Sequence, residues 1–160
     1  MNILRWIDRN LWSIPVLVFF MIELAFSLWS VMSPRPVLLA ALPPTTREAM
    51  YSSLTGTASA FFGIALAVVA ILVAFPKLMA TSIEQGLVRA RTIVIGSLLM
   101  SSFFMLAIVT TATIALAVDL RPAGNYAVTT LIEASCMASV TGLLVGGIGL
   151  AYVVVERSRH

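Results

Sequence analysis

The sequence predicts an all-α integral membrane protein, built as a bundle of four transmembrane helices. Hydrophobic residues make up 60% of the 160-residue chain, whereas soluble domains are ~45–50% apolar. The mean hydropathy is +1.03. Each of four long apolar stretches exceeds the ~20 residues that a helix needs to cross a bilayer. These stretches span about 11–33, 52–75, 93–118 and 128–155. Because the connections are too short to fold independently, we expect a single transmembrane domain over residues 1–160.

The first apolar stretch follows a short leader, residues 1–10, in which apolar and charged residues alternate. This pattern is typical of a short helix that lies on the membrane surface. The stretch itself is ~22 residues long and contains Glu23, whereas the apolar region of a signal peptide has 7–15 residues. We therefore predict a retained span, with Pro15 in its first turns, where the missing N–H does little damage.

The second stretch is preceded by six apolar residues, 37–42, which are too few to cross a bilayer. They are expected to lie in the membrane interface or to cover the top of the bundle. Thr45 and Glu48 then have the spacing of a capping box. This spacing predicts that the second helix begins several residues before its apolar stretch.

The third and fourth stretches are bounded by similar signals. Thr81 and Glu84 repeat the capping-box spacing, which predicts a third helix from near Ser82. Residues 119–125 are rich in helix breakers and predict a turn before the last span. At ~28 residues the fourth stretch is longer than a bilayer requires, so we expect it to tilt.

The positive charges are distributed unequally between the connections. If the chain crosses four times, seven of the 10 Lys and Arg residues fall on one side and three on the other. The three are Arg35, Arg47 and Arg121. Since cytoplasmic loops carry the excess of basic residues, both termini are predicted to be cytoplasmic. The net charge of +3 is thus explained by topology and by contact with anionic lipids, and does not indicate nucleic-acid binding.

Two glutamates, Glu23 and Glu133, are the only Asp, Glu, Lys, Arg or His residues in the four apolar stretches. A charge at the centre of a span costs ~2.5–3.5 kcal/mol on insertion scales, so such a residue suggests a function by default. Ser27 and Ser30 follow Glu23 on one helix face, and Thr130 lies about one turn before Glu133. These five residues predict a site that binds a proton or a small cation. Whether the two carboxyl groups meet is left open.

A structural interpretation of the same residues is equally open. A protonated glutamate can hydrogen-bond across helices and hold a bundle or an oligomer together. Small residues recur at every fourth position beside Glu133: Ala134, Ala138, Gly142 and Gly146. Such a ridge lets helix backbones approach closely, within one chain or between subunits. The shorter series Ser59, Gly63 and Ala67 in the second stretch is its expected mate within the bundle.

Enzyme chemistry has little support in the sequence. The chain has one cysteine, Cys136, inside the fourth stretch, and one histidine, His160, at its end. No metal-ligand spacing, nucleophile with a base or phosphate-binding loop is recognisable. We therefore expect no enzymatic activity, no metal and no cofactor.

Residues 54–76, LTGTASAFFGIALAVVAILVAFP, resemble helix two of small four-helix bacterial membrane proteins. Most proteins of this kind are uncharacterised, and some accompany phage-defence genes. The resemblance covers this helix and the general layout. It implies a membrane effector or accessory subunit and assigns no catalytic residue.

Together these patterns predict an oligomeric multi-pass protein of the cell membrane, plasma or inner, that moves protons or small cations through Glu23 and Glu133. The alternative is a non-transporting membrane subunit or effector, for example in a defence or signalling complex, that acts by helix-mediated assembly. The expected partners are the lipid bilayer and further copies of the chain. A membrane or cytoplasmic protein partner is also possible.

Overall fold

The computed structural model describes residues 13–32, 38–74, 84–118 and 124–158 of the chain. Within this part, the elements in chain order are α2 (Ile14–Met32), the short 3-10 helix η2 (Leu38–Ala41), α3 (Pro44–Ala74), α4 (Glu84–Val118) and α5 (Tyr126–Ser158). The predicted leader helix over 1–10 and the predicted cap at Thr81 lie outside the described residues.

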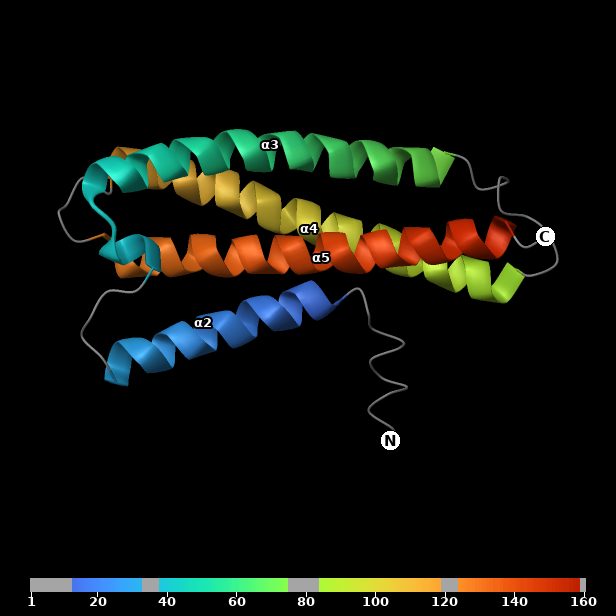
Figure 1. Ribbon diagram of the computed structural model, residues 1–160, viewed down its shortest axis with the longest axis horizontal. Coiled ribbons are helices and arrows are strands. Elements are labelled where there is room, and N and C mark those ends of the chain that lie inside the picture. Colours follow the sequence, from blue (N-terminus) through green and yellow to red (C-terminus); the bar gives the residue numbers. More distant parts are fainter. Residues whose placement is uncertain (1–12, 33–37, 75–83, 119–123, 159–160) are drawn as a thin grey trace.

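The long helices lie side by side as a bundle (Figure 1). Helix α3 packs on α4, α4 packs on α5, and α2 packs mainly on α5 with a smaller contact to α4. All four long helices of the described chain are long and apolar enough to cross a membrane. The predicted all-α architecture is therefore confirmed, as is the number of candidate spans among these residues.

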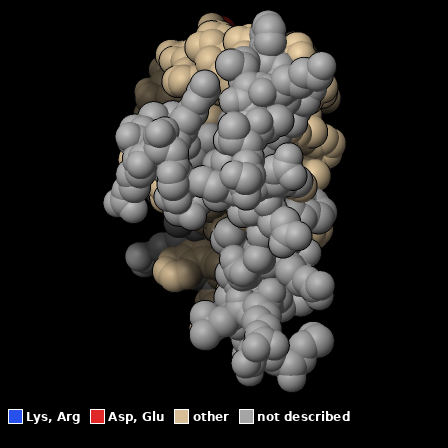
Figure 2. Space-filling model, turned by 90° about the vertical axis from the view of Figure 1, so that its right-hand side faces the viewer, with Lys and Arg blue, Asp and Glu red and all other residues tan. Residues whose placement is uncertain are grey.

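The lipid-compatible character of the bundle is visible on its outside. Large apolar side chains point away from the protein on every long helix, for example Val31 at 86% exposure and Ile148 at 71%. In Figure 2, which looks end-on at the bundle from the side opposite η2, the described residues that can be seen are almost all uncharged. An apolar exterior of this kind fits a hydrocarbon solvent, in which backbone polar groups are satisfied inside each helix.

The interior between α4 and α5 is built from small side chains. Ala134, Ala138, Gly142 and Gly146 are all buried. A Cβ atom added at Gly146 would lie 3.2 Å from the Ser97 hydroxyl, and one added at Gly149 would lie 2.6 Å from Val94. The ridge thus lies against α4, where the two helix backbones come close together.

The expected mate of this ridge differs from the observed one. Ser59, Gly63 and Ala67 of α3 are exposed, and a Cβ atom added at Gly63 would meet nothing within 4 Å. The partner of the ridge is the face of α4 that carries Ser97 and Ser101. Helix α3 presents its small residues to the outside because its inner face packs on α4 through Ala58 and Ala65.

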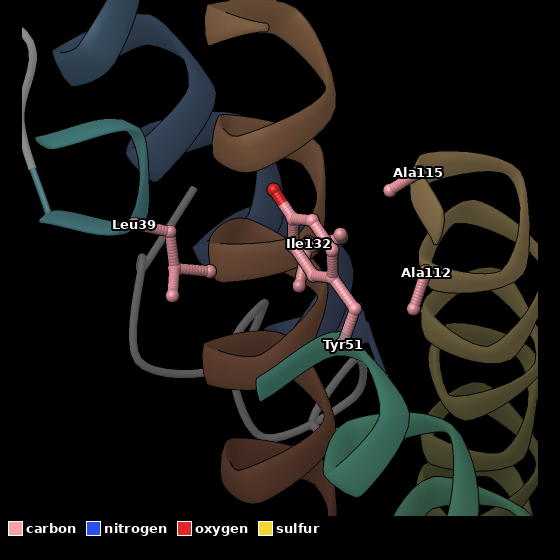
Figure 3. Close-up of a cluster of buried hydrophobic side chains, with 5 residues drawn as sticks. All are labelled: Leu39, Tyr51, Ala112, Ala115 and Ile132. Atoms are coloured by element: carbon pink, nitrogen blue, oxygen red, sulfur yellow. The ribbon is translucent and has the colours of Figure 1, made fainter. Parts of the chain in front are cut away.

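One end of the bundle is closed by η2; we call it the η2 end. Here α2 and α4 finish, and α3 and α5 begin (Figure 1). A buried cluster joins η2, α3, α4 and α5 through Leu39, Tyr51, Ala112, Ala115 and Ile132, as Figure 3 shows. Residues 37–42 were expected to lie in the membrane interface or to cover the top of the bundle. The described part of this segment covers the end of the bundle.

Helix α3 starts at a proline and not at the predicted capping box. The backbone N–H of Arg47 donates to the carbonyl of Pro43 at 3.0 Å, which closes the first helical turn. Pro44 is then the first helical residue, where its missing N–H is not needed and its fixed φ favours the helix. Thr45 lies inside this turn, so the predicted cap was wrong, whereas the early start of the helix is confirmed.

Arg47 is the largest fully buried side chain among the described residues, with 1% exposure. Its Nη1 donates to the carbonyl of Leu42 at 2.8 Å. Its guanidinium also packs on Gly124, where an added Cβ atom would come within 3.2 Å of it. In the sequence analysis, Arg47 was only one of the three basic residues predicted on the outer side of the membrane. In the structure it joins the start of α3 to the segment before α5.

We expect Arg47→Met to lower the free energy of unfolding by about 1.5–3 kcal/mol, the usual contribution of a hydrogen bond from a charged group. Methionine keeps part of the packing volume but leaves the Leu42 carbonyl without this donor. Denaturant unfolding in micelles, followed by circular dichroism, measures the change. Glu48→Met, at the exposed next position, is the control, and an equal loss in both variants would contradict the role given to Arg47.

Candidate functional site

Glu23 lies at the middle of α2, on a helix whose other residues are uncharged. Its Oε1 is buried and has no hydrogen-bond partner within the described part of the chain. A buried polar atom normally has such a partner, and an unpaired one is costly. No contact in the described bundle therefore explains why α2 carries a glutamate at position 23.

Two contacts on either side of Glu23 hold α2 against α5. Near the start of α2, Pro15 is buried, and a Cβ atom added at Gly142 would lie 3.0 Å from its ring. Near the end of α2, the Tyr126 hydroxyl donates to the carbonyl of Phe26 at 2.7 Å. Glu23 is thus fixed on the α2–α5 interface between a packing contact and a hydrogen bond.

Tyr126 also relates the two glutamates to each other. Both Glu133 and Glu23 lie close enough to the Tyr126 phenol for a charge on either carboxyl group to act on it. No hydrogen bond between the two carboxyl groups occurs in the described structure. The structure therefore brings Glu23, Tyr126 and Glu133 into one neighbourhood near the η2 end without a direct pair of carboxyl groups.

Glu133 has a partner that the sequence did not reveal. Its Oε1 accepts a hydrogen bond of 2.8 Å from the backbone N–H of Leu39. The first N–H groups of a helix have no partner within that helix, and a carboxylate is a favourable acceptor for them. Glu133 therefore caps η2 and holds it on α5.

The hydroxyl groups of the predicted site do not gather around the carboxyls. Ser27 and Ser30 lie on the exposed side of α2, and the Ser30 hydroxyl donates to the Ser27 carbonyl at 2.8 Å. Thr130 is buried, and its hydroxyl donates to the Ala127 carbonyl at 3.2 Å. The hydroxyls of Ser30 and Thr130 are thus used within their own helices, and Ser27 and Ser30 face away from the bundle.

A row of buried serines between α4 and α5 was not predicted as a unit. Ser97 and Ser101 of α4 and Ser135 and Ser139 of α5 are all buried. The Ser101 hydroxyl donates to the Ser139 carbonyl at 3.1 Å, which joins the two helices. The four-residue spacing within each pair was the available signal, since it places both hydroxyls on one helix face.

Comparison with protein-family models, with curated proteins and with solved structures finds no match for this chain. The resemblance of residues 54–76 to small bacterial membrane proteins therefore stays a prediction. Among the described residues, no group of three or more His, Cys, Asp or Glu side chains is placed to hold a metal ion.

Proposed function

We propose that this protein moves protons or small cations across a membrane, and that Glu23 is the carboxyl group that binds the ion. The observation that carries the proposal is the buried Oε1 of Glu23, which has no hydrogen-bond partner in the described chain. An ionisable group retained at such cost within a span is a functional candidate by default.

The surroundings of the two glutamates support a division of roles. Glu133 accepts a hydrogen bond from the backbone of η2, so one of its oxygens has a structural use. Glu23 has no comparable use, and none of the spans Ile14–Met32, Thr92–Val118 and Tyr126–Ala151 contains Lys, Arg or His. A proton or a cation is then the natural partner of Glu23, because no basic side chain in these spans can neutralise it.

The proposal includes an orientation and an assembly. The positive-inside rule puts the η2 end on the outer side of the cell membrane and both termini in the cytoplasm. Helix α3 carries open glycines, Gly56 and Gly63, on its outer face. Small residues let helices of different subunits approach closely, so we place further copies of the chain on this face.

Proton flux into liposomes tests the proposal. Wild-type protein should acidify or alkalinise the lumen when a pH gradient or a potential is imposed, and Glu23→Gln should reduce this flux to that of protein-free vesicles. Glutamine has nearly the same shape as glutamate but cannot exchange a proton, so the loss would report chemistry and not packing. Flux of Na⁺ and K⁺, followed with ion-sensitive dyes, covers the small cations.

The matched control is Glu48→Gln, which makes the same chemical change at an exposed position of α3. It should retain wild-type flux. Absence of flux in the wild type, or equal flux in the wild type and Glu23→Gln, would overturn the proposal. Either result would favour the alternative of a non-transporting membrane subunit, which the hydrogen bond between Glu133 and η2 also suits.

A further inference from the structure

Glu23 lies too deep in the described conformation for an ion to reach it directly from water. Residue 23 is nine positions from each end of α2, Ile14–Met32, which is about 13–14 Å along the helix axis. Its Oε1 is buried. At the same depth, Met21 and Leu24 are 61% and 56% exposed on the apolar exterior. A movement of the protein must therefore open a path before this carboxyl group exchanges an ion with water.

Helix α2, at the side of the bundle (Figure 1), is the helix best suited to make this movement. Pro15 is its only buried residue, whereas α4 and α5 have buried residues along most of their described length. Helices in lipid are not driven together by the hydrophobic effect, so packing and hydrogen bonds hold them in place. In the described chain, one hydrogen bond joins α2 to another helix, from the Tyr126 hydroxyl to the Phe26 carbonyl at 2.7 Å.

The space between α2 and its neighbours is also incompletely filled. A cavity of about 400 Å³ lies between α2, α4 and α5, and all its lining residues except Ser135 are apolar. Phe19 of α2 stacks on Phe104 of α4 at its wall, with ring centroids 5.1 Å apart. Side chains that line a void lose dispersion contacts on that side. Helix α2 is thus packed less closely than α4 and α5 are packed on each other.

The two ends of α2 are attached in different ways. Near its start, Pro15 packs so closely that a Cβ atom added at Gly142 would lie 3.0 Å from its ring. Near its end, the Tyr126 hydroxyl holds the Phe26 carbonyl. This carbonyl lies inside α2, where the N–H of Ser30 is its partner in the helix, so it stays satisfied when the tyrosine leaves. The end with Phe26 can therefore separate from α5 for the loss of a single hydrogen bond.

We propose that α2 is a gate over Glu23, and that the Tyr126 hydroxyl is the latch that holds this gate closed. When the hydrogen bond to Phe26 breaks, α2 tilts away from α5 about its contact at Pro15, and a path to Glu23 opens from the η2 end. Glu23 lies between the contact and the latch, so it becomes uncovered from one side only. The gate rests on the proposed function in one respect, since it has a use only if Glu23 exchanges an ion.

Tyr126→Phe tests the latch, because it removes the hydroxyl and keeps the ring. Spin labels on Leu28→Cys and Met50→Cys, in a Cys136→Ser background, report the distance between α2 and α3 by pulsed electron paramagnetic resonance. Both positions are exposed and near the η2 end, and α3 lies across the bundle from α2 (Figure 1). We call them the latch pair. Its longer-distance population should rise by roughly 2- to 13-fold in Tyr126→Phe, the factor that corresponds to a net hydrogen bond of ~0.5–1.5 kcal/mol.

A second pair of labels, on Leu17→Cys and Ile71→Cys, joins the same two helices at the opposite end of the bundle; we call it the pivot pair. Both positions are exposed. Its distance should not change in Tyr126→Phe, because the packing of Pro15 still holds this end of α2. An equal shift of both pairs would mean that the whole helix detaches, and this result would overturn the gate.

Tyr51→Phe is the matched control substitution. Tyr51 is a buried tyrosine at the same end of the bundle, in a cluster whose described members come from η2, α3, α4 and α5. Loss of its hydroxyl should leave the latch pair unchanged. An unchanged latch pair in Tyr126→Phe, or an equal response to Tyr51→Phe, would contradict the role given to Tyr126. Circular dichroism of each variant establishes that it is folded.

Distance and flux fail independently. Tyr126→Phe should raise proton flux into liposomes, because more of the protein samples the open form; flux below that of the wild type in the folded variant would overturn the latch. If the wild type gives flux but the latch pair does not respond to Tyr126→Phe, the gate is overturned and the proposed function stands. If the latch pair responds but the wild type gives no flux of protons or small cations, the movement of α2 is supported and the proposed function is overturned.

Discussion

Gly142→Leu should lower the free energy of unfolding by about 3 kcal/mol, the upper end of the usual range for an overpacked interior. A Cβ atom at position 142 would collide with the Ser101 hydroxyl, and it would lie 3.1 Å from the backbone carbonyl of Ser97 and 3.0 Å from Pro15. The backbone carbonyl cannot move without a shift of α4. The larger leucine side chain must therefore separate α5 from both α4 and α2.

Denaturant unfolding of the purified protein in micelles, followed by circular dichroism, measures this change. The control is Gly147→Leu on the same helix, because an added Cβ atom there meets nothing within 4 Å and the residue is exposed. Both substitutions replace glycine by a better helix former, so helix propensity cancels in the comparison. Equal stability of the two variants would contradict the close packing of α4 and α5 at Gly142.

The ridge of small residues shows how far sequence reasoning reaches. A repeat at every fourth position places Ala134, Ala138, Gly142 and Gly146 on one helix face, and all four are buried. Spacing does not say which helix will lie against that face. Ser59, Gly63 and Ala67 had a similar spacing, but the ridge lies against Ser97 and Ser101 of α4, whose hydroxyls are small enough to permit the same approach.

The candidate site was predictable only in part for a related reason. The cost of a carboxyl group in a span singles out Glu23 and Glu133 from the sequence alone. Their different surroundings depend on contacts between distant segments, namely Leu39 with Glu133 and Phe26 with Tyr126. No local pattern encodes the position of η2, which is set by the burial of Leu39 with side chains of α3, α4 and α5.

The cavity between α2, α4 and α5 illustrates the same limit. Phe19 and Phe20 are neighbours in the sequence, as are Phe103 and Phe104, and either pair alone suggests ordinary lipid-facing or core residues. Only the packing of α2 on α4 and α5 brings the two pairs together around one space. The spacing within each helix was readable, but the pairing of the rings across helices was not.

Glu133→Leu should release η2 from the end of the bundle, whereas Glu133→Gln should retain it. The N–H of Leu39 donates to Glu133 Oε1 at 2.8 Å, and Leu39 is 8% exposed. Leucine removes the acceptor and leaves the N–H unpaired, at a cost of about 1–3 kcal/mol. Glutamine still offers a carbonyl oxygen at the same distance along the side chain. Hydrogen exchange of the Leu39 amide should therefore accelerate by roughly 5- to 150-fold in Glu133→Leu, since each 1.4 kcal/mol corresponds to a factor of ten.

The same two variants test whether the glutamates have separate roles. If Glu133 acts through its hydrogen bond to η2, Glu133→Gln should keep both the slow exchange of Leu39 and the proton flux, while Glu23→Gln loses the flux and leaves the exchange unchanged. Loss of flux in Glu133→Gln with slow exchange preserved would mean that a titratable proton is required at both positions. The two carboxyl groups, which both lie near the Tyr126 phenol, would then act as one site.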